Sequence, residues 1–143
     1  MIYNDILETI GSTPVVKLNS IGKDLECNLY AKIEMVNPGG SVKDRTAFRM
    51  IDHAEKEGRI KPGDTLIEAT SGNTGIALAC VCATRGYRLI LTMPSSMSTE
   101  RRKMLLFLGA KIVITPKEMG MNGAIEKAKK IHKDTPNLSL IHI

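Results

Sequence analysis

The sequence predicts an α/β fold in which a parallel twisted sheet carries helices on both faces. Short apolar segments alternate with helix-like patterns, and this alternation is typical of parallel strands joined by crossover helices. Glycines also stand where three of the helices should stop, at Gly58, Gly86 and Gly109. No repeat or long linker interrupts the pattern in the 143 residues, a length typical of one domain.

The predicted strands and helices follow one another in a regular order. Strands are expected at residues 29–34, 65–69, 89–93 and 111–115, and helices at residues 44–57, 75–85, 99–108 and 123–133. In the first helix, Ala47, Met50, Ile51 and Ala54 form an apolar stripe at helical spacing. The helical segment 76–83 is apolar almost all round, so we expect its neighbours to cover most of it.

Composition argues against a membrane span, a secreted protein and a metal site. Hydrophobic residues make up 43% of the chain, yet no apolar run approaches the roughly 18 residues of a spanning helix. The first residues lack a basic segment followed by an apolar one, so we expect no signal peptide and a cytoplasmic location. Cys27, Cys80 and Cys82 are predicted to be buried free thiols in a reducing compartment. The three histidines are scattered, so no metal site is expected.

The net charge of +5 comes from residues 101–134, where lysine and arginine outnumber acidic residues. Basic regions of this kind can bind nucleic acid. Here, however, the lysines surround inward-facing apolar positions such as Ile125, Ala128 and Ile131, and no aromatic residues lie among them. We therefore expect a solvated basic face and no nucleic-acid partner.

One lysine stands at a turn that leads into a helix. Asn37-Pro38-Gly39-Gly40 cannot continue a regular element, and Ser41 is a plausible helix N-cap. Lys43 then falls in the first turn, where the partial positive charge of the helix N-terminus disfavours a protonated amine. A lysine that forms a Schiff base needs its amine neutral.

A second segment adds an anion-binding loop. Thr70-Ser71-Gly72-Asn73-Thr74-Gly75 lies between a predicted strand and a predicted helix. Such a loop offers backbone N–H groups and the positive end of the helix dipole to an anion, and its hydroxyls and amide add donors.

Together the two segments resemble one family, the fold-type II pyridoxal-phosphate enzymes of the cysteine synthase group. Three further stretches match that family in the same order: residues 10–18, with Ser12 where asparagine is commoner, residues 93–102, and residues 120–124. The resemblance covers nearly everything from Ile10 to about Lys130.

The resemblance implies a function and roles for individual residues. Lys43 would hold pyridoxal 5'-phosphate covalently and act as the base that removes the substrate α-proton. Asn73 would hydrogen-bond the phenolic oxygen of the cofactor. The substrate carboxylate would be bound by the remaining loop residues, Thr70, Ser71, Gly72 and Thr74. The implied reaction is β-replacement on O-acetyl-L-serine with sulfide, giving L-cysteine and acetate, in a homodimer with no membrane partner.

Several alternatives stay open. Serine/threonine dehydratases of this fold tend to carry S-F-K-x-R, whereas Ser41-Val42-Lys43-Asp44-Arg45 favours a synthase. The residues Gly39-Gly40-Ser41-Val42-Lys43 are typical of the B-type cysteine synthase. Cystathionine β-synthases share both motifs, although residues 118–124 are more like a cysteine synthase. The sulfur donor, whether sulfide, thiosulfate or homocysteine, is not settled. A non-catalytic fragment or interaction module is the alternative of a different class. A P-loop or Rossmann reading is disfavoured, because the chain has no Walker A motif and no G-x-G-x-x-G.

The resemblance also implies a domain division. The family continues beyond residue 143 with a glycine-rich loop for the cofactor phosphate and a hydroxyl residue for the pyridine nitrogen. We therefore expect the chain to be the N-terminal portion of such an enzyme. Residues 44–137 would form its smaller α/β domain, and residues 1–43 would belong to the larger cofactor domain with the missing C-terminal part. The family usually has a Gln-Phe stretch in place of residues 141–143, and we expect the 143 residues alone to be inactive.

Overall fold

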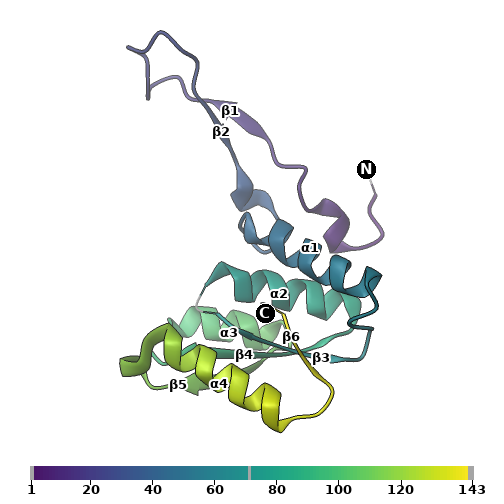
Figure 1. Cartoon of the computed structure of the whole chain (residues 1–143). Coiled ribbons are helices and arrows are strands. Elements are labelled where there is room, and N and C mark those ends of the chain that lie inside the picture. The colour runs from purple at the N-terminus through teal and green to yellow at the C-terminus, as the bar shows by residue number, and fades with distance from the viewer. Residues whose placement is uncertain (1, 71, 142–143) are drawn as a thin grey trace.

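A computed structural model describes residues 2–70 and 72–141. Within these residues the strands form two sheets (Figure 1). Strands β1 (Val15–Lys17) and β2 (Tyr30–Lys32) form an antiparallel pair. The larger sheet has four strands in the order β5-β4-β3-β6. These are β3 (Thr65–Ala69), β4 (Arg88–Pro94), β5 (Lys111–Thr115) and β6 (Leu138–Leu140).

All pairings in the four-stranded sheet are parallel, as predicted. Ile67 in β3 lies opposite Ile90 in β4 and Leu140 in β6, and Leu91 in β4 lies opposite Ile112 in β5. The central strands are buried on both faces and are therefore apolar almost throughout, which explains why they read as short continuous apolar runs.

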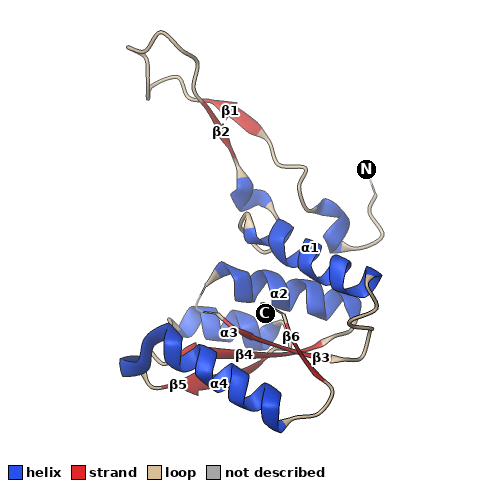
Figure 2. Cartoon of the chain, viewed as in Figure 1, coloured by secondary structure: helices blue, strands red, loops and turns tan. Residues whose placement is uncertain are grey.

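Helices cover both faces of this sheet (Figure 2). The helices are α1 (Lys43–Lys56), α2 (Asn73–Arg85), α3 (Thr99–Phe107) and α4 (Gly120–Asp134). Short 3₁₀ turns occur at Ile6–Thr9, Glu34–Val36 and Lys117–Met119. Helices α2 and α3 lie on one face, α4 lies on the other, and α1 packs on the outer side of α2. The predicted bounds agree closely, except that α4 begins three residues before the predicted start at 123.

The core forms where α2 lies between α1 and the sheet. Leu78 and Val81 of α2, Ile51 of α1, and Leu66 and Leu91 of the sheet are almost completely buried. This confirms that α2 is covered on most sides. The predicted helix stops are confirmed as well, because the three glycines adopt positive φ angles of 68°, 77° and 84°, which favour glycine.

The antiparallel pair forms an arm that projects from this core (Figure 1). The strand predicted at residues 29–34 is shorter than expected and pairs with β1, outside the four-stranded sheet. Large apolar side chains are exposed along the arm, including Val15, Ile21 and Tyr30. Cys27 is exposed too, so the prediction of buried thiols is wrong for this residue. Cys80 is half-buried and Cys82 is buried, because both lie on α2.

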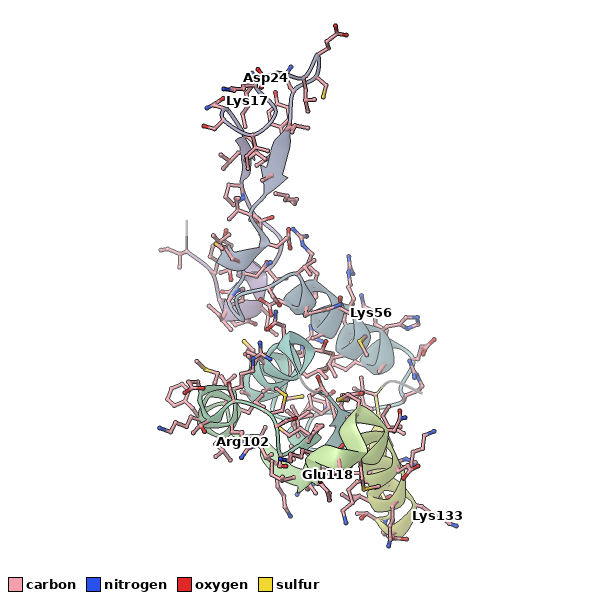
Figure 3. The ribbon with its side chains drawn as sticks, turned by 90° about the vertical axis from the view of Figure 1, so that its left-hand side faces the viewer. Lys17, Asp24, Lys56, Arg102, Glu118 and Lys133 are labelled. Atoms are coloured by element: carbon pink, nitrogen blue, oxygen red, sulfur yellow. The ribbon has the colours of Figure 1, made fainter. Side chains whose placement is uncertain are left out.

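The lysines of the basic segment are solvated, as expected, but Ile125, which was expected to face inward, is exposed as well. Lys127, Lys129 and Lys130 on α4 are exposed, and Lys133 at the end of this helix points into solvent (Figure 3). In the described part of the chain, no helix has the length and apolar character that a membrane crossing requires. Residues 2–70 and 72–141 also contain no group of histidine, cysteine and acidic side chains arranged to hold a metal ion.

Candidate active site

A hydrogen-bonded turn delivers Lys43 to the start of α1. Gly40 has a φ of 81°, and its N–H donates to the carbonyl of Asn37 at 2.8 Å. The Ser41 hydroxyl then accepts a hydrogen bond from the Lys43 N–H at 3.1 Å, although the N-cap of the helix is Val42 and not, as predicted, Ser41. Lys43 is the first residue of the helix and is exposed, so its amine is accessible to a ligand.

Asn37 ties this turn to the start of the chain. Its side-chain amide is buried and donates to the carbonyls of Glu34 and Ser41, at 2.8 and 3.1 Å. Its side-chain oxygen accepts from the Gly11 N–H at 3.0 Å. One buried amide therefore joins the Gly11 segment, the 3₁₀ turn at Glu34–Val36 and the turn before α1.

Arg45 reinforces the same junction. Its guanidinium donates to both carboxylate oxygens of Glu34, at 2.8 and 2.9 Å, and to the Gly11 carbonyl at 2.8 Å. The Arg45 hydrogen bond, with a further one from the Thr13 hydroxyl, lowers the pKa of Glu34 to about 2. Arg45 is thus engaged with Glu34 and Gly11 of the protein itself.

The second predicted segment begins where β3 ends. Thr70 is buried, and its N–H continues the sheet by donating to Thr92 at 3.1 Å. Gly72 is the N-cap of α2 and has no side chain, so in the described residues no side chain caps the first turn. Asn73 is exposed and Thr74 is half-buried. Ser71 lies outside the described residues. The uncapped N–H groups of the first helical turn suit an anion.

A cavity of about 370 Å³ opens beside this loop. It lies between the ends of β3 and β6 and the helix α4, and it is lined by Glu68, Ala69, Thr70, Thr74, Ile125, Ala128, Lys129 and Leu140. Thr70 and Thr74 are the two predicted site residues that line it. Glu68 and Lys129 also line the cavity, and no motif in the sequence predicted them as site residues. The signal for Glu68 was available, since a carboxylate in an otherwise apolar strand is unusual.

Lys43 and the loop come from different helices that start at the same end of the domain. Figure 1 shows α1 and α2 running side by side in the same direction. At their far ends, Arg85 of α2 pairs with Glu55 and with Asp52 of α1, and the Asp52 contact measures 3.6 Å. The parallel arrangement places the first turns of both helices on the side where β3 ends.

The donor set fits pyridoxal phosphate. An exposed primary amine condenses with a carbonyl, whereas exposed amide and hydroxyl groups at an uncapped helix start hold anionic and polar groups. Lys43 would supply the amine, and Asn73 an amide for the cofactor ring.

Comparisons with known proteins give a consistent result. A cysteine synthase from Staphylococcus aureus is 54% identical over 131 residues, which cover 92% of this chain and 42% of the relative. A cystathionine beta-synthase from Dictyostelium discoideum is 50% identical over 144 residues, covering 99% of this chain and 29% of the relative.

Solved structures agree. A cysteine synthase from Entamoeba histolytica superposes with a TM-score of 0.93 at 43% identity, over 99% of this chain and 43% of that one. An O-ureido-L-serine synthase superposes with a TM-score of 0.88 at 45% identity, over 94% of this chain and 42% of that one. The chain thus spans less than half the length of each of these relatives. The family described as "pyridoxal-phosphate dependent enzyme" matches residues 6–142, and because this match covers nearly the whole chain, the protein belongs to that family.

Proposed function

We propose that this chain provides one wall of the active site of a pyridoxal-phosphate enzyme that converts O-acetyl-L-serine and sulfide into L-cysteine and acetate. The observation that carries the proposal is the pairing of an exposed lysine at the start of α1 with an uncapped, hydroxyl-bearing loop at the start of α2. The first element suits a carbonyl cofactor and the second suits a carboxylate, and a cofactor-dependent reaction of an amino acid needs both.

Each residue has a separate task in this proposal. When bound, the cofactor supplies an electron sink for the substrate α-carbon. Lys43 would hold the cofactor and, once released from it, take the α-proton at its amine nitrogen. Asn73 would hydrogen-bond the cofactor ring oxygen. The carboxylate of the amino acid would be bound by the rest of the loop: Thr70, Ser71, Gly72 and Thr74.

The domain division belongs to the same proposal. Residues 44–137 would act as the smaller domain, which closes over the substrate. Residues 1–43 would pack with the larger cofactor domain of a longer protein, and the exposed apolar side chains of the arm support this. A cytoplasmic homodimer is proposed on the resemblance alone.

A second candidate is cystathionine β-synthesis, in which homocysteine replaces sulfide. The 50% identity to the Dictyostelium discoideum relative favours keeping it. The two candidates differ in the nucleophile that adds to the amino acid, sulfide or homocysteine.

A chimera tests the proposal directly. The aligned segment of the Staphylococcus aureus cysteine synthase is replaced by residues 6–141 of this chain, and cysteine formation from O-acetylserine is measured with sulfide and with homocysteine. We expect turnover with sulfide, none in the Lys43→Ala chimera, and none from the 143-residue chain by itself. A folded, dimeric chimera that binds the cofactor but makes no product with either thiol would contradict the proposal.

The loop assignment has its own test in the same chimera. Losing one hydrogen bond to a charged group costs about 1.5–3 kcal/mol. Thr70→Ala should therefore weaken amino-acid binding by roughly 10- to 100-fold while the spectrum of the bound cofactor stays the same. Loss of the cofactor with unchanged amino-acid affinity would show that Thr70 binds the cofactor and not the substrate carboxylate.

A further inference from the structure

Asp44 directly follows the exposed lysine, yet it is one of the most buried polar residues in the described chain. Its side chain is only 2% exposed, although it lies in the first turn of α1. The carboxylate turns back under the preceding turn, where its Oδ2 accepts a hydrogen bond from the Gly39 N–H at 2.8 Å. Asp44 thus links the first turn of the helix to the turn that leads into it.

The contact at Gly39 leaves no room for another side chain. A Cβ atom on Gly39 would lie 2.2 Å from Asp44 Oδ1 and 3.0 Å from its Cγ. The carboxylate therefore fills the space that a side chain at position 39 would need. Gly39 is required here for close approach, whereas Gly40 is required for its positive φ angle.

Burial of this carboxylate has a cost. Oδ1 is inaccessible and has no hydrogen-bond partner within residues 2–70 and 72–141. Desolvation raises the pKa of Asp44, and the backbone hydrogen bonds from Gly39 and Ser41 only partly oppose this effect. An exposed acidic residue at this position would interact equally well with the helix dipole without that penalty. The burial therefore needs a reason other than helix stability.

We propose that Asp44 is a positioning residue: its carboxylate holds the Gly39–Ser41 turn closed against α1 and so fixes the direction in which Lys43 leaves the helix. Three groups hold this turn from different sides. Asn37 bonds Gly40 and Ser41, Ser41 bonds the Lys43 N–H, and Asp44 bonds Gly39. Among the hydrogen bonds of residues 2–70 and 72–141, the Asp44 contact is the one that connects Gly39, at the beginning of the turn, to the helix itself.

The competing explanation is a plain interaction with the helix dipole, and two substitutions separate the two. Asp44→Glu keeps the negative charge in the first turn, but the longer side chain does not fit the space beneath Gly39. Asp44→Asn removes the charge and keeps the shape and an oxygen acceptor for the Gly39 N–H. Positioning predicts that Asn works and Glu fails, whereas a dipole effect predicts the reverse.

Amide hydrogen exchange of the 143-residue protein, followed by NMR, measures the contact. The Gly39 amide should exchange about tenfold faster in Asp44→Ala and Asp44→Glu than in the wild type, and at nearly the wild-type rate in Asp44→Asn. The amide of buried Ile51 in α1 reports whether the helix remains folded. If Asp44→Ala does not fold, the Glu and Asn variants decide. Unchanged exchange at Gly39 in Asp44→Glu, or loss of protection in Asp44→Asn, would overturn the inference.

A second readout tests the consequence for Lys43 and rests on the proposed function. Each variant is treated with pyridoxal phosphate and borohydride, and the pyridoxyl label is mapped by mass spectrometry. The ratio of label at Lys43 to label at Lys56, an exposed lysine at the other end of α1, should fall in the Glu variant and persist in the Asn variant. A wild type that shows no preference for Lys43 would count against the proposed function, and the exchange data would still decide the role of Asp44.

Discussion

Adding a single methyl group at Gly75 would press directly on the proposed substrate loop. Gly75 lies in the first turn of α2, and a Cβ atom there would meet the methyl carbon Cγ2 of Thr70 at 2.6 Å. Carbon atoms in contact prefer about 3.5–4.0 Å, so one of the two groups would have to move by about 1 Å. Thr70 is buried at the end of β3 and its N–H is held by Thr92, which leaves it little freedom to move.

Two opposing terms set the size of the effect. Overpacking of a buried site costs typically about 1–3 kcal/mol. Replacing glycine by alanine within a helix stabilises it by about 1 kcal/mol, and by less in the first turn. The clash should therefore dominate, and we expect Gly75→Ala to lower the free energy of unfolding by about 0–2 kcal/mol.

A double-mutant cycle isolates the clash. Thr70→Ser removes the methyl carbon that the new Cβ would meet and keeps the hydroxyl, whose oxygen is 3.7 Å away. In that background Gly75→Ala should be neutral or stabilising, so the coupling between the two sites equals the clash, about 1–3 kcal/mol. Urea unfolding followed by circular dichroism measures all four proteins. A coupling below about 0.5 kcal/mol would refute the packing argument.

Three further predictions concern the core, the ion pair between Glu34 and Arg45, and the cysteines. Leu78→Ala removes a fully buried side chain between α1 and the sheet, so urea unfolding should show a loss of about 2–5 kcal/mol, and a smaller loss would mean that α2 is less tightly packed than the structure shows. Because the pKa of Glu34 is lowered, its pairing with Arg45 should stabilise the protein fully above the ordinary pKa of 4.5 and progressively less as the pH falls toward about 2. The melting temperature of Glu34→Gln, measured against pH, should lack this dependence. A pH profile identical to that of the wild type would contradict the prediction. At pH 8 a thiol reagent should modify exposed Cys27 quickly and should reach Cys82 only on unfolding, because burial raises the pKa of Cys82 to about 12. Rapid labelling of Cys82 in the folded protein would contradict this and show that α2 opens.

The motifs predicted much of the candidate site because their geometry is local. The turn before α1 depends on residues within a few positions of one another, so the contact between Ser41 and Lys43 and the position of Lys43 follow from their order in the chain. The same holds for the loop after β3, where a strand, a glycine and a helix succeed one another directly. The burial of Asp44 could not be predicted from the order of residues, because it depends on how the turn folds back over the helix.

The features that the sequence did not predict depend on contacts between distant segments of the chain. Glu68 and Lys129 line the same cavity only because α4 packs across the end of β3, more than fifty residues away along the chain. Asn37 and Arg45 bind the Gly11 segment for the same reason. The periodicity of the sequence does not predict contacts between residues so far apart in the chain.

The sequence by itself determined the order of β2 to β5 and of the four α-helices, the stops at the three glycines and the place of Lys43, because each of these rests on the conformational preferences of neighbouring residues and on apolar spacing. The tertiary structure alone decided that β2 pairs with β1, that Cys27 is exposed on the resulting arm, and which side chains share a cavity with Thr70. The reason is physical: burial of an apolar segment is favourable against any suitable apolar surface. The sequence of the segment therefore predicts that it will be buried, whereas the packing of the whole chain determines the surface against which it is buried.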